Sequence, residues 1–71
     1  MPTIRVELFE GRTAEQKRQL AKELTDACVR VLGSRADGVD VLFFEIARGN
    51  WATGGTLWSD TSGAPPPPAG S

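Results

Sequence analysis

Histidine is absent from this sequence, and cysteine occurs once, as Cys28. A single cysteine excludes an internal disulfide, and the common structural zinc sites have no ligands without histidine or further cysteines. The same absence excludes the Ser-His-Asp and Cys-His arrangements that activate many catalytic nucleophiles. The glycine pairs fit neither a phosphate-binding loop nor a dinucleotide fingerprint. Any catalysis must therefore use another kind of residue.

Long apolar runs and an excess of one charge are also missing. No run approaches the roughly 18 apolar residues that span a bilayer, and the start, Met-Pro-Thr-Ile-Arg-Val-Glu, lacks the apolar core of a signal peptide. Eight basic and nine acidic side chains give a net charge of -1, without the basic excess that binding to a nucleic-acid backbone requires. We therefore expect a cytoplasmic protein without a membrane or nucleic-acid partner.

The end of the chain differs in composition from the rest. After a leading threonine, residues 61–71 contain only Ser, Gly, Ala and Pro, including the run Pro65–Pro68. This composition favours a disordered tail, with an SH3-type ligand as the weaker interpretation. We predict one domain at residues 2–60 and a disordered tail at residues 61–71. A domain of about 60 residues leaves much apolar surface uncovered, so self-association is expected to supply the missing stability.

The first half of the chain predicts a strand followed by a long helix. Apolar and polar residues alternate over Thr3–Phe9, which is the period of a half-buried strand. Thr13 and Gln16 have the spacing of a capping box at the start of a helix, and Gly33 suits the left-handed residue that ends one. Apolar residues then recur at spacings of three and four, opposite a charged side. The stripe expected to be buried consists of Leu20, Leu24, Ala27, Cys28, Val31 and Leu32.

The second half predicts a strand and a short hairpin. The run Val39–Ile46 is apolar on both faces for most of its length, as expected of a central strand. A strand, a long helix and a second strand form a parallel β-α-β unit, and Gly54-Gly55 predict a hairpin whose arms carry the two tryptophans. The predicted fold class is α+β. One helix covers only one face of such a sheet, so the other face needs neighbouring subunits.

Pro2 is the unusual candidate for chemistry. Initiator methionine is commonly removed before small residues, and its removal would leave Pro2 with a free secondary amine. A free amino terminus titrates near neutrality, and an apolar pocket or a nearby arginine lowers its pKa by disfavouring the cation. That is the range that a general base needs. Proline at a strand start is also tolerated for backbone reasons alone, so the residue by itself leaves both interpretations open.

Three segments together resemble the 4-oxalocrotonate tautomerase family. They are Pro2–Ile4, Glu10–Lys17 and Glu45–Trp51, followed by Gly54-Gly55. The resemblance runs without gaps to about residue 59, and the joint spacing is far more specific than any one segment. It implies a β-α-β subunit, dimers that join their sheets, and a homohexamer built as a trimer of dimers.

The resemblance also implies a mechanism. In this family the terminal proline moves a proton from an enol oxygen or a carbon to another carbon, which shifts a double bond. Pro2 is then the general base and acid, Arg12 binds a substrate carboxylate, and Trp51 is an apolar wall that keeps the amine neutral. The implied enzyme is an isomerase without a cofactor. It interconverts the enol and α,β-unsaturated keto forms of a small 2-keto acid, such as a 2-hydroxydienoate.

One position departs from the family pattern. Well-known members carry a second arginine early in the second strand, where it binds the substrate's other carboxylate and the keto or enol oxygen, but this sequence has Asp40 there. An acid would repel a second carboxylate, so a dicarboxylate such as 2-hydroxymuconate is expected to be a poor substrate. Arg35 and Arg48 are possible replacements, although each is otherwise an ordinary surface charge. Phe9 occupies a position where dehalogenase relatives have arginine, which argues against that activity.

Two alternatives remain open from the sequence. The first is a hydratase or decarboxylase of the same superfamily, in which a cationic proline acts as an acid. The second is a non-catalytic oligomeric module that kept the fold, because a fold alone does not establish a function.

Overall fold

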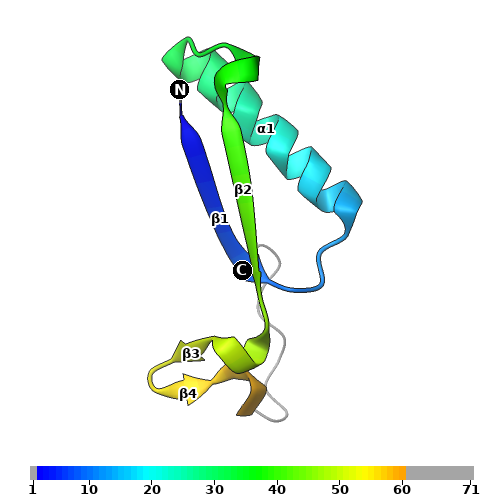
Figure 1. The fold of residues 1–71 in the computed structure, drawn as a ribbon, viewed down its shortest axis with the longest axis vertical. Helices are drawn as coiled ribbons and strands as arrows, with labels where there is room; N and C mark the ends of the chain where they lie inside the picture. The colour runs from blue at the N-terminus through cyan, green and yellow to red at the C-terminus, as the bar shows by residue number, and fades with distance from the viewer. Residues whose placement is uncertain (1, 61–71) are drawn as a thin grey trace.

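One long helix packs on two parallel strands, and a small hairpin lies beyond the end of the second strand. The computed structural model describes residues 2–60. Figure 1 shows β1 and β2 side by side, with α1 next to them and the β3–β4 hairpin past the far end of β2. The elements are β1 (Thr3–Phe9), α1 (Ala14–Leu32), η1 (Ala36–Gly38), β2 (Asp40–Ile46), η2 (Arg48–Asn50), β3 (Ala52–Thr53), β4 (Thr56–Leu57) and η3 (Trp58–Asp60).

This order confirms the predicted α+β class and the β-α-β unit. The tail predicted at residues 61–71 lies outside the described residues. The segment expected as a loop before β2 contains the short 3-10 helix η1, and β2 begins one residue later than predicted, at Asp40. The reason is that Val39 is the C-cap of η1, since its N–H donates to the carbonyl of Ala36.

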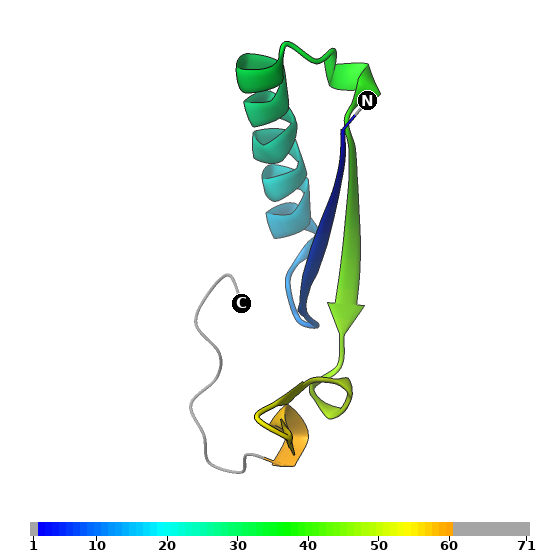
Figure 2. The ribbon, with the colours of Figure 1, turned by 90° about the vertical axis from the view of Figure 1, so that its left-hand side faces the viewer.

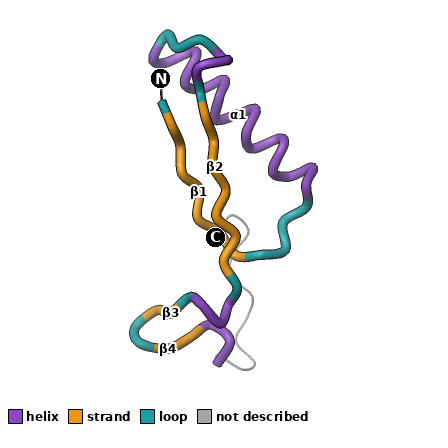
Figure 3. The backbone as a smooth tube through the Cα atoms, viewed as in Figure 1, coloured by secondary structure: helices purple, strands orange, loops and turns teal. Residues whose placement is uncertain are grey.

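The two long strands pair over their whole length. Their parallel register joins Thr3 with Asp40 at one end and Phe9 with Ile46 at the other. Because successive side chains of a strand alternate between the two faces, Leu8 and its partner Glu45 share one face. That face lies toward the helix, where Lys17 Nζ donates to Glu45 Oε2 at 3.0 Å. Figure 2 shows α1 on one side of the sheet and, within residues 2–60, no element packed on the other side, and Figure 3 traces the same elements by secondary structure.

Both ends of α1 have the predicted caps. Thr13 Oγ1 accepts the N–H of Gln16, Gln16 Oε1 accepts the N–H of Thr13, and each distance is 3.0 Å. Gly33 has φ 70°, and its N–H donates to the carbonyl of Val29. The reciprocal bonds satisfy free amides at the helix start, while the left-handed glycine satisfies a carbonyl at its end. No helix within residues 2–60 combines the length and the apolarity needed to cross a membrane.

The core of the single chain is small. Among the described residues only Leu8 and Phe9 are buried, with 6% and 5% of their surface exposed. The predicted helix stripe is half-buried at Leu24, Ala27 and Cys28. The prediction is wrong for Leu20, Val31 and Leu32, which are 38%, 72% and 65% exposed. A sheet of only two strands is too narrow to cover the whole stripe.

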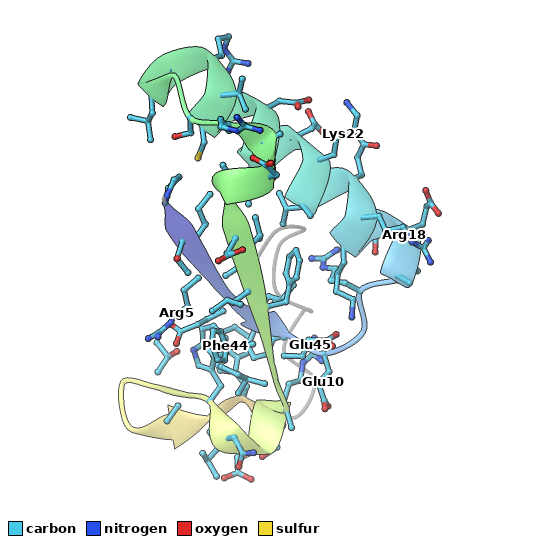
Figure 4. The ribbon with its side chains drawn as sticks, turned by 45° about the horizontal axis from the view of Figure 1, so that its top comes forward. Arg5, Glu10, Arg18, Lys22, Phe44 and Glu45 are labelled. Atoms are coloured by element: carbon cyan, nitrogen blue, oxygen red, sulfur yellow. The ribbon has the colours of Figure 1, made fainter. Side chains whose placement is uncertain are left out.

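The face of the sheet that α1 leaves uncovered is partly apolar. Leu42 and Phe44 are 42% and 40% exposed there, and the Arg5 guanidinium lies over the Phe44 ring at 5.2 Å from its centroid (Figure 4). This confirms the prediction that one helix leaves the other face of the sheet uncovered within one chain. β2, predicted as a central strand, pairs only with β1 in the part of the chain that the structure describes.

The hairpin forms around the predicted glycine pair. Gly54 and Gly55 have φ of 62° and 84°, as a two-residue type I′ turn requires. The arms are only two residues long, so the tryptophans flank them instead of lying within them. The N–H of Trp58 donates to the carbonyl of Trp51 at 2.9 Å, which extends the pairing by one step.

We predict that Thr13→Ala lowers the free energy of unfolding by about 1 kcal/mol, because the helix loses the side-chain acceptor of its N-cap. Thr13→Ser keeps the oxygen and is expected to stay close to the wild type. Denaturant unfolding of both variants at one protein concentration tests this. Equal midpoints for the alanine and serine variants would contradict the assigned cap.

Candidate active site

Pro2 lies at the open end of the sheet, next to the start of β2. Its carbonyl accepts the N–H of Asp40 at 3.0 Å, and the residue is half-buried. The chain returns to this point because α1 ends at Gly33 and the following connection leads into a strand parallel to β1. A hollow of about 350 Å³ opens here, lined by Pro2, Ser34, Arg35, Asp37 and Gly38.

Arg35 and Asp37 form a forked pair beside this hollow. Arg35 Nε donates to Asp37 Oδ1 at 3.1 Å, and Nη2 donates to Oδ2 at 3.2 Å. Both side chains are largely exposed, at 86% and 72%. Of the two sequence candidates for a second arginine, Arg35 is therefore the one that shares a hollow with Pro2. The sequence reasoning missed Asp37, and the Arg-x-Asp spacing after the helix was its only signal.

Asp40 occupies the same end of the molecule. It is the first residue of β2, it is exposed, and it stands opposite Thr3 in the strand register. None of the ion pairs found within residues 2–60 involves its carboxylate. The described charges around Pro2 are thus the Arg35 guanidinium and the carboxylates of Asp37 and Asp40, a local balance of one positive against two negative charges.

Arg12 lies at the opposite end of β1. The turn after the strand passes through Gly11, whose φ of 115° suits glycine, and Arg12 then directly precedes the N-cap of α1. Arg12 is half-buried and helps to line a hollow of about 170 Å³ between β1 and the helix. The other lining residues are Val6, Leu8, Gln16, Lys17 and Leu20.

Trp51 belongs to an aromatic cluster at the far end of the sheet. Its ring lies 4.5 Å from that of Phe9, centroid to centroid, and the Trp58 ring packs edge-on against Phe9 at 5.4 Å. The Arg48 guanidinium lies 4.9 Å from the Phe9 centroid. Phe9 therefore supports both Trp51 and Arg48, a role that the sequence reasoning did not assign. Its signal was an apolar residue on the strand face that otherwise carries Thr3, Arg5 and Glu7.

A single chain does not bring the candidate residues together. Pro2 precedes the seven-residue strand β1 and Arg12 follows it, so a strand of roughly 20 Å separates them. Arg35 and Asp40 lie at the end with Pro2, whereas Arg48 and Trp51 both contact Phe9, at the end of β1 that is nearer to Arg12. Within the described residues no group of three acidic, histidine or cysteine side chains is placed to hold a metal ion.

Fold and site together define a class of small β-α-β subunit with a proline at one end of its sheet and an arginine and a tryptophan at the other. A family model described as "Tautomerase enzyme" matches residues 2–61. A probable tautomerase of Streptococcus pneumoniae is 44% identical over 57 residues, which cover 80% of this chain and 95% of that protein. The chain belongs to the tautomerase family.

Solved structures agree with this assignment. The crystal structure of a 4-oxalocrotonate tautomerase homologue is 43% identical with a TM-score of 0.83, and the match covers 89% of this chain and all of that one. A heterohexamer 4-oxalocrotonate tautomerase from Chloroflexus aurantiacus is 28% identical with a TM-score of 0.79, covering 86% and 98%. These matches confirm the resemblance to the 4-oxalocrotonate tautomerase family.

Proposed function

We propose that this protein is a tautomerase that interconverts the enol and the α,β-unsaturated keto form of a small 2-keto acid, with Pro2 as the proton carrier. The observation that carries the proposal is the family match that begins at residue 2, which makes Pro2 the first residue of the matched domain. The hollow beside Pro2 supports it, because a substrate can approach the start of the chain there.

The proposed reaction moves one proton and one double bond. The Pro2 nitrogen accepts the proton of the 2-hydroxyl group, and the electrons of that O–H bond form the keto C=O. The π electrons of the former enol C=C then take the same proton from the prolinium ion at a carbon. Nothing else is gained or lost, so the net reaction is an isomerisation without a cofactor. It requires a free amine, and mass analysis that finds Met1 still attached to the native protein contradicts it.

The other candidate residues have complementary roles in this proposal. Arg12 binds the substrate carboxylate with its planar fork of donors and withdraws electron density from the reacting atoms. Trp51 provides an apolar wall that excludes water, which favours the neutral amine. The packing of Trp51 on Phe9 supports such a role, since it holds the indole in one place.

We infer that the complete site forms between subunits. Both outer edges of the two-stranded sheet are open within the described chain. If two copies join their β1 edges across a two-fold axis, the strands run antiparallel, and the Pro2 end of one copy meets the Arg12 and Trp51 end of the other. The exposed face with Leu42 and Phe44 then remains for contacts between such pairs. A homohexamer of three such pairs would complete each site between two copies and would also cover the exposed faces.

Asp40 narrows the proposed substrate class. Its backbone N–H donates to the Pro2 carbonyl, so its carboxylate adds negative charge to the Pro2 end of the sheet, and this charge would repel a second carboxylate of the substrate. We therefore propose a substrate with a single carboxylate, such as 2-hydroxypenta-2,4-dienoate, in preference to 2-hydroxymuconate, which carries two.

A second candidate function is hydration or decarboxylation with a cationic proline. The observation that favours it is the pair of carboxylates, Asp37 and Asp40, at the Pro2 end, because nearby negative charge stabilises a cation. The single arginine at this end, Arg35, favours the neutral amine instead, because its positive charge repels a cationic proline.

We predict that Pro2→Ala and Arg12→Ala each lower kcat/KM at least about 100-fold, and that mixing the two restores activity. Unfolding both variants together and refolding them at equal amounts should recover roughly a quarter of the wild-type rate. Half of the sites have an intact Pro2, and half of these meet an intact Arg12 of another copy. A mixture no more active than the separate variants would place both residues in one subunit. If the protein is a non-catalytic module, even the wild type would show no turnover of any enol.

The pH dependence of kcat/KM separates the two candidate functions. A base mechanism predicts a rate that rises with pH as the Pro2 amine loses its proton and then levels off, whereas an acid mechanism predicts the reverse. The groups whose charges act on this amine are Arg35 and Asp37 of the connection before β2 and Asp40 of β2. Rates measured from about pH 5 to 10 on 2-hydroxypenta-2,4-dienoate give the sign of the slope, and a falling profile would rule out the base mechanism.

We predict that Asp40→Asn raises the ratio of kcat/KM for 2-hydroxymuconate to that for 2-hydroxypenta-2,4-dienoate by roughly fivefold to tenfold. The substitution removes one like charge and keeps the backbone bond to Pro2, and about 1 kcal/mol of repulsion corresponds to such a factor. Asp26→Asn, on the exposed side of α1, is the matched control and should leave the ratio unchanged. An unchanged ratio in Asp40→Asn would show that Asp40 does not select the substrate.

A further inference from the structure

Arg35 is the cation that the fold places beside Pro2. As the hydroxyl proton leaves the substrate, negative charge develops on the 2-oxygen, and a fixed donor next to that oxygen stabilises the transition state. Arg12 cannot serve this purpose from within the same chain, because it lies at the other end of β1. Arg35 lines the same hollow as Pro2, and Arg48 contacts Phe9 at the far end of the sheet.

The connection that carries Arg35 is fixed by backbone hydrogen bonds. The N–H of Gly38 donates to the carbonyl of Arg35 at 2.9 Å, and the N–H of Val39 donates to that of Ala36 at 3.2 Å. These bonds close the 3-10 turn η1 and lead directly into β2, whose register with β1 is set along seven pairs. The position of the Arg35 backbone relative to Pro2 therefore follows from the same pairing that forms the sheet.

The side chain of Arg35 is oriented and still has donors to offer. A guanidinium has five N–H donors, and Asp37 takes two of them, one from Nε and one from Nη2. The remaining three, on Nη1 and Nη2, are enough for an anionic oxygen. A forked pair also restricts the rotamers of a long side chain, so less entropy is lost when it binds a ligand.

We propose that Arg35 binds the 2-oxygen of the substrate and stabilises its negative charge while the proton is on Pro2, and that Asp37 is the residue that positions Arg35. This inference rests on the proposed tautomerase function and deepens it. Because Asp37 already balances the charge of Arg35, the hollow stabilises one developing negative charge, and its lining residues offer no second arginine or lysine to a second carboxylate.

Variants of Arg35 and Asp37 test the proposal with 2-hydroxypenta-2,4-dienoate as the probe. Arg35→Met is expected to lower kcat at least about tenfold with little change in KM, because the charge that it stabilises develops only during the reaction. Arg35→Lys keeps the charge without the fork and should recover part of the loss. The matched control is Arg18→Met, since Arg18 is also an exposed arginine bound to a carboxylate, that of Glu15 at 2.9 Å.

Asp37→Asn measures the positioning role. Measured in the pH range where the rate has levelled off, it should lower kcat by roughly threefold. Arg35→Met combined with Asp37→Asn should there be no slower than Arg35→Met alone, because Asp37 then affects the rate only by positioning Arg35. Additive losses would overturn the positioning role. Circular dichroism and the hydrodynamic size of each variant report on folding and assembly, and the lysine variant still decides the question if the methionine variant fails to fold.

The outcomes distinguish this inference from the function on which it rests. If Arg35→Met and Arg35→Lys keep kcat within twofold of the wild type while Pro2→Ala loses it, Arg35 is a surface charge and the tautomerase proposal stands. If the wild type turns over neither 2-hydroxypenta-2,4-dienoate nor 2-hydroxymuconate, the proposed function fails and the role of Arg35 fails with it.

Discussion

The parallel pairing of β1 and β2 is the constraint on which the rest of the structure depends. A parallel pair requires a long crossover, and α1 provides it. The same geometry brings the beginnings of both strands to one edge, so the carbonyl of Pro2 meets the N–H of Asp40. It also brings the ends of both strands to the other edge, where Phe9 packs against Trp51.

This arrangement places the candidate functional residues at two opposite ends of one subunit. Pro2, Arg35 and Asp40 lie at the first end, and Arg12 and Trp51 lie at the second. The small core is a related consequence, since a two-stranded sheet with one helix leaves its second face open. The proposed assembly would resolve both matters, because an antiparallel contact between two copies would join unlike ends, and contacts between such pairs would cover the open face.

Local patterns predicted the elements well because each depends on short-range chemistry. The capping box of Thr13 and Gln16, the left-handed Gly33 and the Gly54-Gly55 turn are decided within a few residues. Burial was harder to predict. The helical period places Val31 on the apolar stripe, but whether a stripe is covered depends on how wide the neighbouring sheet is.

The sequence by itself determined the family, the order of the elements and the identity of Pro2, Arg12 and Trp51 as candidates, because these follow from residue types at fixed spacings. The tertiary structure alone decided which candidates are neighbours. It placed Arg35 beside Pro2 with Asp37 as its partner, and it placed Arg48 on Phe9. The physical reason is that these contacts depend on where the chain returns after a 19-residue helix, which strand pairing sets and local spacing does not.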